Sequence, residues 1–124
     1  MKHINAGYVY IGLTITFTVL GQLLVKAGMS KVAASHDQFS RWSSVIIAGF
    51  LQPAVVAGLA CAVVAAMAWF PALMRLPISV AYPFMALPIV LVLLLAPLFF
   101  AERVTINQWM GVAVVSFGLW LGAR

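Results

Sequence analysis

The chain from Ala54 to Phe100 reads AVVAGLACAVVAAMAWFPALM, then Arg75-Leu76-Pro77, then ISVAYPFMALPIVLVLLLAPLFF. A helix needs about 20 apolar residues to cross the roughly 30 Å hydrocarbon core of a bilayer, and both runs are that long. A very short link joins them. The two runs therefore predict consecutive membrane helices over 54–74 and 78–100.

Two further apolar runs, over 7–28 and 108–122, predict a first and a fourth membrane helix. The composition agrees, since 65% of the 124 residues are hydrophobic and 7% are charged, against about 25% charged residues in soluble domains. Mean hydropathy is +1.14. We expect an all-α integral membrane protein in which residues 1–124 form a single four-helix transmembrane domain. The first run is longer than the core of a secretory signal peptide, which is the competing interpretation.

The stretch between the first and second runs, Ser30 to Ser44, is the most polar part of the chain. Beyond it, Trp42, Ile46 and Phe50 recur every four residues. This spacing predicts a short amphipathic helix that lies in the membrane interface and ends near Pro53.

Small residues and prolines predict the shape of the second and third spans. Gly58, Ala62 and Ala66 fall on one stripe of the second span, which lets another helix approach closely. The third span contains Pro83, Pro88 and Pro97. Because proline removes a backbone donor, we expect this helix to be kinked near the first two.

The charge pattern leaves the orientation open. One side of the membrane would carry Lys2, Arg75 and Arg124, and the other Lys26, Lys31, Arg41 and Arg103, which is almost no positive-inside bias. The net charge of +5 includes no basic run of the kind that binds nucleic acid. The sequence also has no His/Cys cluster, GxSxG motif or phosphate-binding glycine loop, so we expect no cofactor and no enzyme activity.

Four polar residues of the first span, Thr14, Thr18, Gln22 and Lys26, stand four apart and share one helix face. Threonine hydroxyls can bond to carbonyls of the preceding turn. The side-chain amide of Gln22, in contrast, needs several hydrogen-bond partners within the span. Lys26 has two interpretations. It extends to the lipid headgroups, or it faces a cavity and binds an anionic group.

Glu102 and Arg103 lie on the turn after the third span, and counting the spans places them on the same side as Lys26. A solvated turn is the alternative to a functional role for Glu102. Arg75 lies at the opposite face, where contact with phospholipid is the plain explanation.

Four segments together resemble the small four-helix members of the drug/metabolite transporter superfamily. The resemblance covers nearly the whole chain, and it rests on residues 19–27 (VLGQLLVKA), 76–83 (LPISVAYP), 99–103 (FFAER) and 108–113 (QWMGVA). One branch, the small multidrug exporters, carries an essential glutamate eight residues before the motif's lysine, where this chain has Thr18. These exporters also have a tryptophan where Met85 stands. Both departures disfavour drug–proton antiport, which stays the alternative function.

The second branch, the 4-amino-4-deoxy-L-arabinose-phosphoundecaprenol flippase subunits, fits better. Its pattern is similar to Gly21-Gln22-x-x-x-Lys26, Ala81-Tyr82-Pro83 and the acidic residue Glu102. The resemblance implies transport of an undecaprenyl phosphate-linked sugar across the bacterial inner membrane for lipid A modification. It implies substrate contacts for Gln22, Lys26, Tyr82 and Glu102. We add Thr18, which shares the helix face of Gln22 and Lys26, and Arg75, because a cation at the opposite membrane face can hold the phosphate at the other end of its path. A non-transporting accessory subunit is a third alternative.

The last span carries a small-residue pattern for helix association. Gly111 and Gly118 are two turns apart, and Gly118 and Gly122 form a GxxxG pair. Four helices leave little room for both a groove and its surroundings. We therefore expect a homodimer, or a heterodimer with a similar small subunit, held by this span and embedded in membrane lipids.

Overall fold

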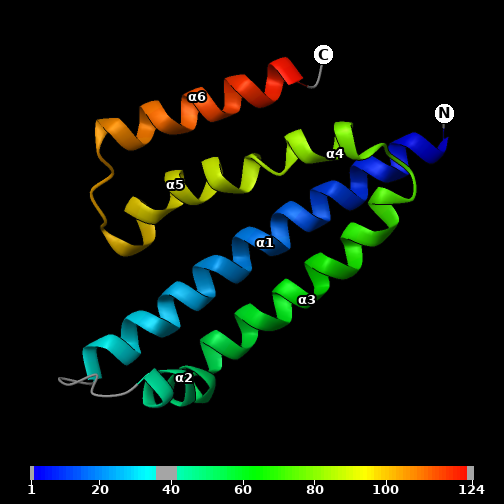
Figure 1. Ribbon diagram of the computed structural model, residues 1–124. Helices are drawn as coiled ribbons and strands as arrows, with labels where there is room; N and C mark the ends of the chain where they lie inside the picture. Colours follow the sequence, from blue (N-terminus) through cyan, green and yellow to red (C-terminus); the bar gives the residue numbers. More distant parts are fainter. Residues whose placement is uncertain (1, 36–41, 123–124) are drawn as a thin grey trace.

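The computed structural model describes residues 2–35 and 42–122, and every element in these ranges is an α-helix (Figure 1). The predicted all-α class is confirmed. Arg41 and Arg124, which entered the charge comparison, lie outside the described residues. The helices are α1 (Lys2–Ser35), α2 (Trp42–Leu51), α3 (Pro53–Leu73), α4 (Ile78–Phe84), α5 (Leu87–Phe100) and α6 (Ile106–Gly122).

Within the described residues, three helical segments are long and apolar enough to cross a membrane: Asn5–Ser35, Pro53–Leu73 and Ile78–Phe100. This number fits a multi-pass membrane protein. The last helix, α6, has 17 described residues, which rise about 25 Å, against a hydrocarbon core of roughly 30 Å. The fourth crossing therefore stays a prediction.

The first helix extends beyond the apolar run that predicts it. It continues past Gly28 to Ser35, because Val32 is buried and the hydroxyls of Ser30 and Ser35 donate to carbonyls one turn earlier. Serines that bond back in this way satisfy their own polar group within the helix. A hydropathy pattern alone does not report such a polar extension.

Helices α1 and α3 lie side by side and antiparallel, in closer contact than any other pair of helices (Figure 1). A Cβ atom on Gly21 would lie 2.8 Å from the carbonyl oxygen of Gly58, and one on Gly58 would lie 2.7 Å from that of Gly21. Only a hydrogen fits at either position, so the backbones touch. The close approach expected at Gly58 is confirmed, and the helix that approaches is α1.

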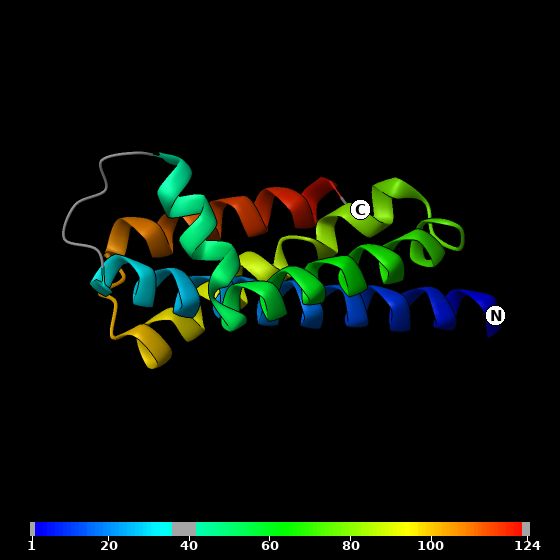
Figure 2. The same ribbon diagram turned by 90° about the horizontal axis from the view of Figure 1, so that it is seen from below.

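The buried core extends from this helix pair to α4. Ile11, Ile15 and Val19 of α1 pack with Ala72, Leu76 and Ala81. Helix α1 lies between α3 and α5, as Figure 1 shows. The N-terminal end of α1 and the α3–α4 turn lie at one end of the molecule, while α2 and the α5–α6 turn lie at the other (Figure 2).

The third apolar run is broken at Met85 and Ala86, between Pro83 and Pro88, as predicted. Pro88 has no N–H to donate to the carbonyl of Phe84, four residues earlier. The amides of Met85 and Ala86 instead donate to carbonyls three residues back, at 2.9 and 3.2 Å. The break separates α4 from α5.

The predicted short helix after the first span is α2, which crosses α3 steeply (Figure 2). Trp42 is 86% exposed, and Ile46 and Phe50 on the same face are also exposed, while Gly49 is buried. An apolar face turned outward suits an interfacial helix. Its depth in the membrane stays a prediction.

Helix α6 begins at one half of a capping box, in which the Gln108 side chain reaches back to Thr105. The amide of Thr105 donates to Oε1 of Gln108 at 2.8 Å, and the Thr105 hydroxyl donates to the same oxygen at 3.1 Å. From there α6 runs back to contact α4. None of its described residues is buried.

Candidate functional site

A cavity of about 650 Å³ lies between α1 and α3, and the polar face of α1 lines it. Thr14, Thr18, Gln22 and Lys26 all contribute to this lining. The Thr14 hydroxyl donates to the carbonyl of Tyr10 at 2.9 Å, as expected for a threonine within a helix, and lies 3.4 Å from the carbonyl of Ala65.

The space for this cavity comes from small residues of α3. Gly58 contacts α1 and borders the cavity, and Ala62 and Ala66, one and two turns later, also line it. The stripe that predicts close helix packing therefore does two things. It brings the backbones together at one level and leaves room between the helices at the next.

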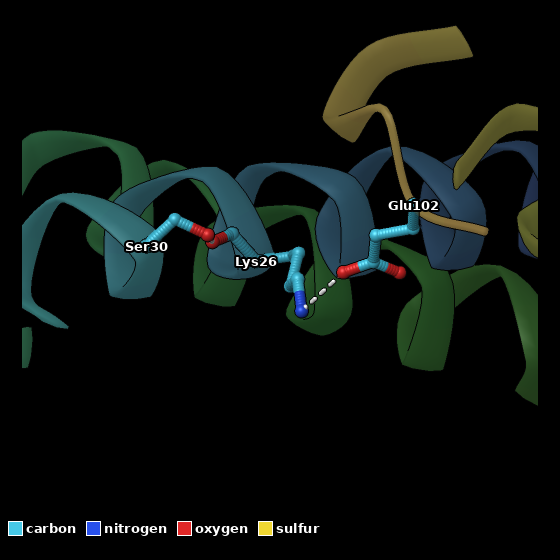
Figure 3. A network of polar contacts seen from close by, with 3 residues as sticks. All are labelled: Lys26, Ser30 and Glu102. Carbon is cyan, nitrogen blue, oxygen red and sulfur yellow. Dashed lines mark hydrogen bonds and ion pairs between the residues drawn. The ribbon is translucent and has the colours of Figure 1, made fainter. Parts of the chain in front are cut away.

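Lys26 forms an ion pair with Glu102, whose Oε1 lies 2.6 Å from the lysine Nζ (Figure 3). The two side chains are 52% and 44% exposed. The pair joins the cavity lining of α1 to the segment after α5. Counting the spans predicts that both residues lie on one side, and the structure brings them into direct contact. Lys26 is therefore a cavity-lining cation with a partner.

Backbone geometry at Ala101 directs the chain toward Lys26. This residue ends α5 with a φ of 52°, and its amide donates to the carbonyl of Pro97 at 3.1 Å. The left-handed conformation is rare for residues other than glycine and costs alanine about 1–2 kcal/mol. A strained turn thus directly precedes Glu102, the residue that contacts α1.

Arg75 lies at the other end of the molecule. Its guanidinium donates to the carbonyl of Pro71 at 3.1 Å and sits 5.0 Å from the ring centroid of Tyr10. Sixteen residues of α1 separate Tyr10 from Lys26, a rise of about 24 Å. The opposite placement of Arg75 and Lys26 agrees with the sequence prediction, and Arg75 does not line the cavity.

Tyr82 also lies outside the cavity lining, but its ring contacts Trp69, which is part of that lining. Lining residues that are not among the predicted site residues include Trp69 of α3 and Met85 at the α4–α5 break. A signal for Trp69 exists, because it follows Ala62 and Ala66 at helical spacing on the same stripe.

The three glycines predicted to form a dimer interface face open space. A Cβ atom on Gly111, Gly118 or Gly122 would have no neighbour within 4 Å. Within residues 2–35 and 42–122, no group of three or more His, Cys, Asp or Glu residues is placed to hold a metal ion.

Comparison with known protein families matches residues 35–123, more than two thirds of the chain, to the EamA-like transporter family. The chain belongs to this family. The match begins at the last described residue of α1, so the α1 side chains that line the cavity lie outside it.

Curated relatives of this EamA-like protein confirm the resemblance to the flippase subunits. It is 47% identical over 53 residues to the "Probable 4-amino-4-deoxy-L-arabinose-phosphoundecaprenol flippase subunit ArnE" of Yersinia pestis (strain Pestoides F), covering 43% of this chain and 46% of the relative. The protein of the same name from Yersinia pseudotuberculosis serotype O:3 (strain YPIII) matches equally. That of Hamiltonella defensa is 40% identical over 53 residues, 43% of this chain and 48% of the relative. The chain thus spans about half the length of the curated relatives it matches. No solved structure matches.

Proposed function

We propose that this protein is a flippase subunit that moves an undecaprenyl phosphate-linked sugar, aminoarabinose, across the bacterial inner membrane for lipid A modification. The observation that carries the proposal is the position of Lys26, a cation at a largely apolar cavity between two membrane helices. The names of the curated relatives support the choice of cargo.

The energetic obstacle to flipping such a lipid is its headgroup. The polyprenyl tail stays in hydrocarbon throughout, whereas the phosphate and the sugar must leave water, which costs several kcal/mol or more for an unpaired charge. A cavity that offers a cation and amide groups lowers this cost. Lys26 supplies the cation, and Gln22, one turn away on the same face, supplies hydrogen bonds.

The Lys26–Glu102 ion pair is weak enough to be exchanged for cargo. Both side chains are about half exposed, and ion pairs of this kind contribute about 0–1 kcal/mol. The phosphate of the cargo is esterified to both the sugar and the polyprenol, so it carries one negative charge, as the carboxylate does, and takes the place of Glu102 at Lys26. The released Glu102 carboxylate then pairs with the amine of the sugar.

Lys26 also favours this proposal over cation efflux, the alternative function. Among the described residues that line the cavity, Lys26 is the one that carries a charge, and the chain has Thr18 where the multidrug exporters carry their glutamate. A cationic drug would find no carboxylate among these lining residues. An anionic headgroup is the better match.

The relatives are named as subunits, and we propose that this chain also works with a second one, either a copy of itself or a similar small protein. The exposed α6 face with Gly111, Gly118 and Gly122 is the proposed contact. In this arrangement α6 is the fourth crossing.

The test is transport by matched lysine variants in the native membrane. We expect Lys26→Ala to reduce transfer of the aminosugar to lipid A about tenfold or more, since a charged hydrogen bond contributes about 1.5–3 kcal/mol. Gln22→Ala should lose less, about three- to tenfold. Lys31→Ala is the control, because Lys31 is exposed on the same helix and is not among the cavity-lining residues. Full activity of both cavity variants, at wild-type membrane levels, would contradict the proposal.

A further inference from the structure

The cavity is elongated, with Lys26 at one end and Trp69 at the other. The contacts between α1 and α3 establish this order, since Gly28 meets Val55, Gly21 meets Gly58, and the Thr14 hydroxyl lies against the Ala65 carbonyl. Trp69 lies one helical turn beyond Ala65. Thr14 and Lys26 are twelve residues apart, a rise of about 18 Å, so the charged and aromatic ends are well separated.

Trp69 is held in place from α4. Its ring contacts that of Tyr82 with centroids 5.8 Å apart and an interplanar angle of 78°, an edge-to-face arrangement that aromatic pairs prefer. Trp69 is partly exposed. Met85, from the proline break three residues after Tyr82, lines the same cavity.

The chemistry at this end suits a sugar ring more than a phosphate or a hydrocarbon chain. A pyranose has hydroxyls around its rim and C–H groups on its faces, and an indole offers a large apolar face with a single N–H donor. Thr18 on α1 adds a hydroxyl along the path between the two ends. The polyprenyl tail has lipid available throughout and needs no such surface.

We propose that Trp69 is the residue against which the sugar ring packs deep in the cavity, and that Tyr82 is a positioning residue that fixes the indole. The inference rests on the proposed function and deepens it. A monosaccharide phosphate cannot span about 18 Å, so Lys26 and Trp69 contact the headgroup at successive points of its path. Lys26 captures the phosphate, and Trp69 selects for the sugar.

Tryptophan fluorescence tests this directly. The chain has four tryptophans, and replacing Trp42, Trp109 and Trp120 with Phe leaves Trp69 as the reporter. In vesicles we expect the emission of Trp69 to shift on addition of the aminosugar-linked undecaprenyl phosphate and to stay unchanged with undecaprenyl phosphate alone. An equal response to both lipids would overturn the assignment, because Trp69 would then sense the tail or the phosphate.

Transport by aromatic variants gives the second arm. Trp69→Ala should lower transport of the glycolipid about tenfold, Trp69→Phe should keep most of it, and Tyr82→Phe should keep more than Tyr82→Ala. Phe70→Ala is the control, since Phe70 is the adjacent aromatic of α3, 65% exposed and outside the cavity lining. Wild-type transport by Trp69→Ala, alongside loss in Lys26→Ala, would overturn the inference and leave the proposed function standing. No transport by the unmodified protein would overturn both.

Discussion

The carboxylate of Glu102 is a built-in competitor for any anion that binds Lys26. Its Oε1 lies 2.6 Å from the lysine Nζ, so the cation is already neutralised before cargo arrives. A headgroup with both a phosphate and an amine can replace this pair with two new ones. A headgroup with a phosphate alone leaves Glu102 without a partner, and this difference is a source of selectivity.

We therefore expect Glu102→Gln to change selectivity more than overall binding. With the competitor removed, Lys26 should bind undecaprenyl phosphate up to about fivefold more tightly, which corresponds to the roughly 1 kcal/mol of an exposed ion pair. The preference for the amine-bearing lipid should fall. Competition binding with the two lipids measures both quantities. A parallel loss of affinity for both would mean that Glu102 only supports the local structure.

At the scale of single residues, the sequence predicts which side chains share a face of one helix better than it predicts contacts between helices. Thr18, Gln22 and Lys26 are four residues apart, and helical periodicity alone puts them on one face. The contact between Lys26 and Glu102 depends in addition on the left-handed turn at Ala101. An alanine there gives no signal of that conformation, which usually favours glycine.

Among the elements, the α1–α3 pair depends on backbone contact at Gly21 and Gly58. We expect Gly58→Leu to destabilise the protein by about 1–3 kcal/mol or more, because the new side chain meets the Gly21 carbonyl and cannot be accommodated without separating the helices. Thermal unfolding in detergent measures the loss. The matched control is Gly12→Leu, since a Cβ at Gly12 has no neighbour within 4 Å. Equal melting temperatures for the two variants would contradict the packing described for this helix pair.

The helix break near Pro83 and Pro88 and the separate helix α2 were both predictable, because each follows from a local rule. Proline lacks a donor, and an apolar residue every fourth position marks one helix face. The cavity was not predictable in this way. It arises where Ala62 and Ala66 of one helix stand opposite a polar face of another, and the sequence alone does not give that register.

At the scale of the whole molecule, the exposed face of α6 is the contact proposed for a second subunit. We expect Gly118→Leu to separate the subunits, because close backbone approach is the principal attraction between helices in lipid. Cross-linking in native membranes measures the loss of the pair. Ala113→Leu is the control, since Ala113 is exposed but lies on the other side of α6 from Gly118 at 3.6 residues per turn. Unchanged cross-linking of Gly118→Leu would remove α6 from the interface.

Composition and hydropathy are enough to predict a multi-pass helical membrane protein, since no soluble surface can be built from so few charged residues. The number of crossings is harder to predict. The described part of α6 is shorter than the three spanning segments, and the nearly balanced flanking charges give no orientation. The depth of a short apolar helix in the membrane depends on a partner or on a tilted neighbouring helix. The sequence of the helix itself encodes neither.

The central claim is that the cavity at Lys26 binds a phosphate-linked sugar lipid. The most direct measurement is mass spectrometry of lipids that co-purify with the protein from bacterial membranes that make the aminosugar lipid, compared with Lys26→Ala and Lys31→Ala prepared identically. We predict enrichment of undecaprenyl phosphate-linked aminoarabinose with the unmodified protein and with Lys31→Ala, and its loss with Lys26→Ala. No enrichment with the unmodified protein, or equal enrichment with Lys26→Ala, would contradict the claim.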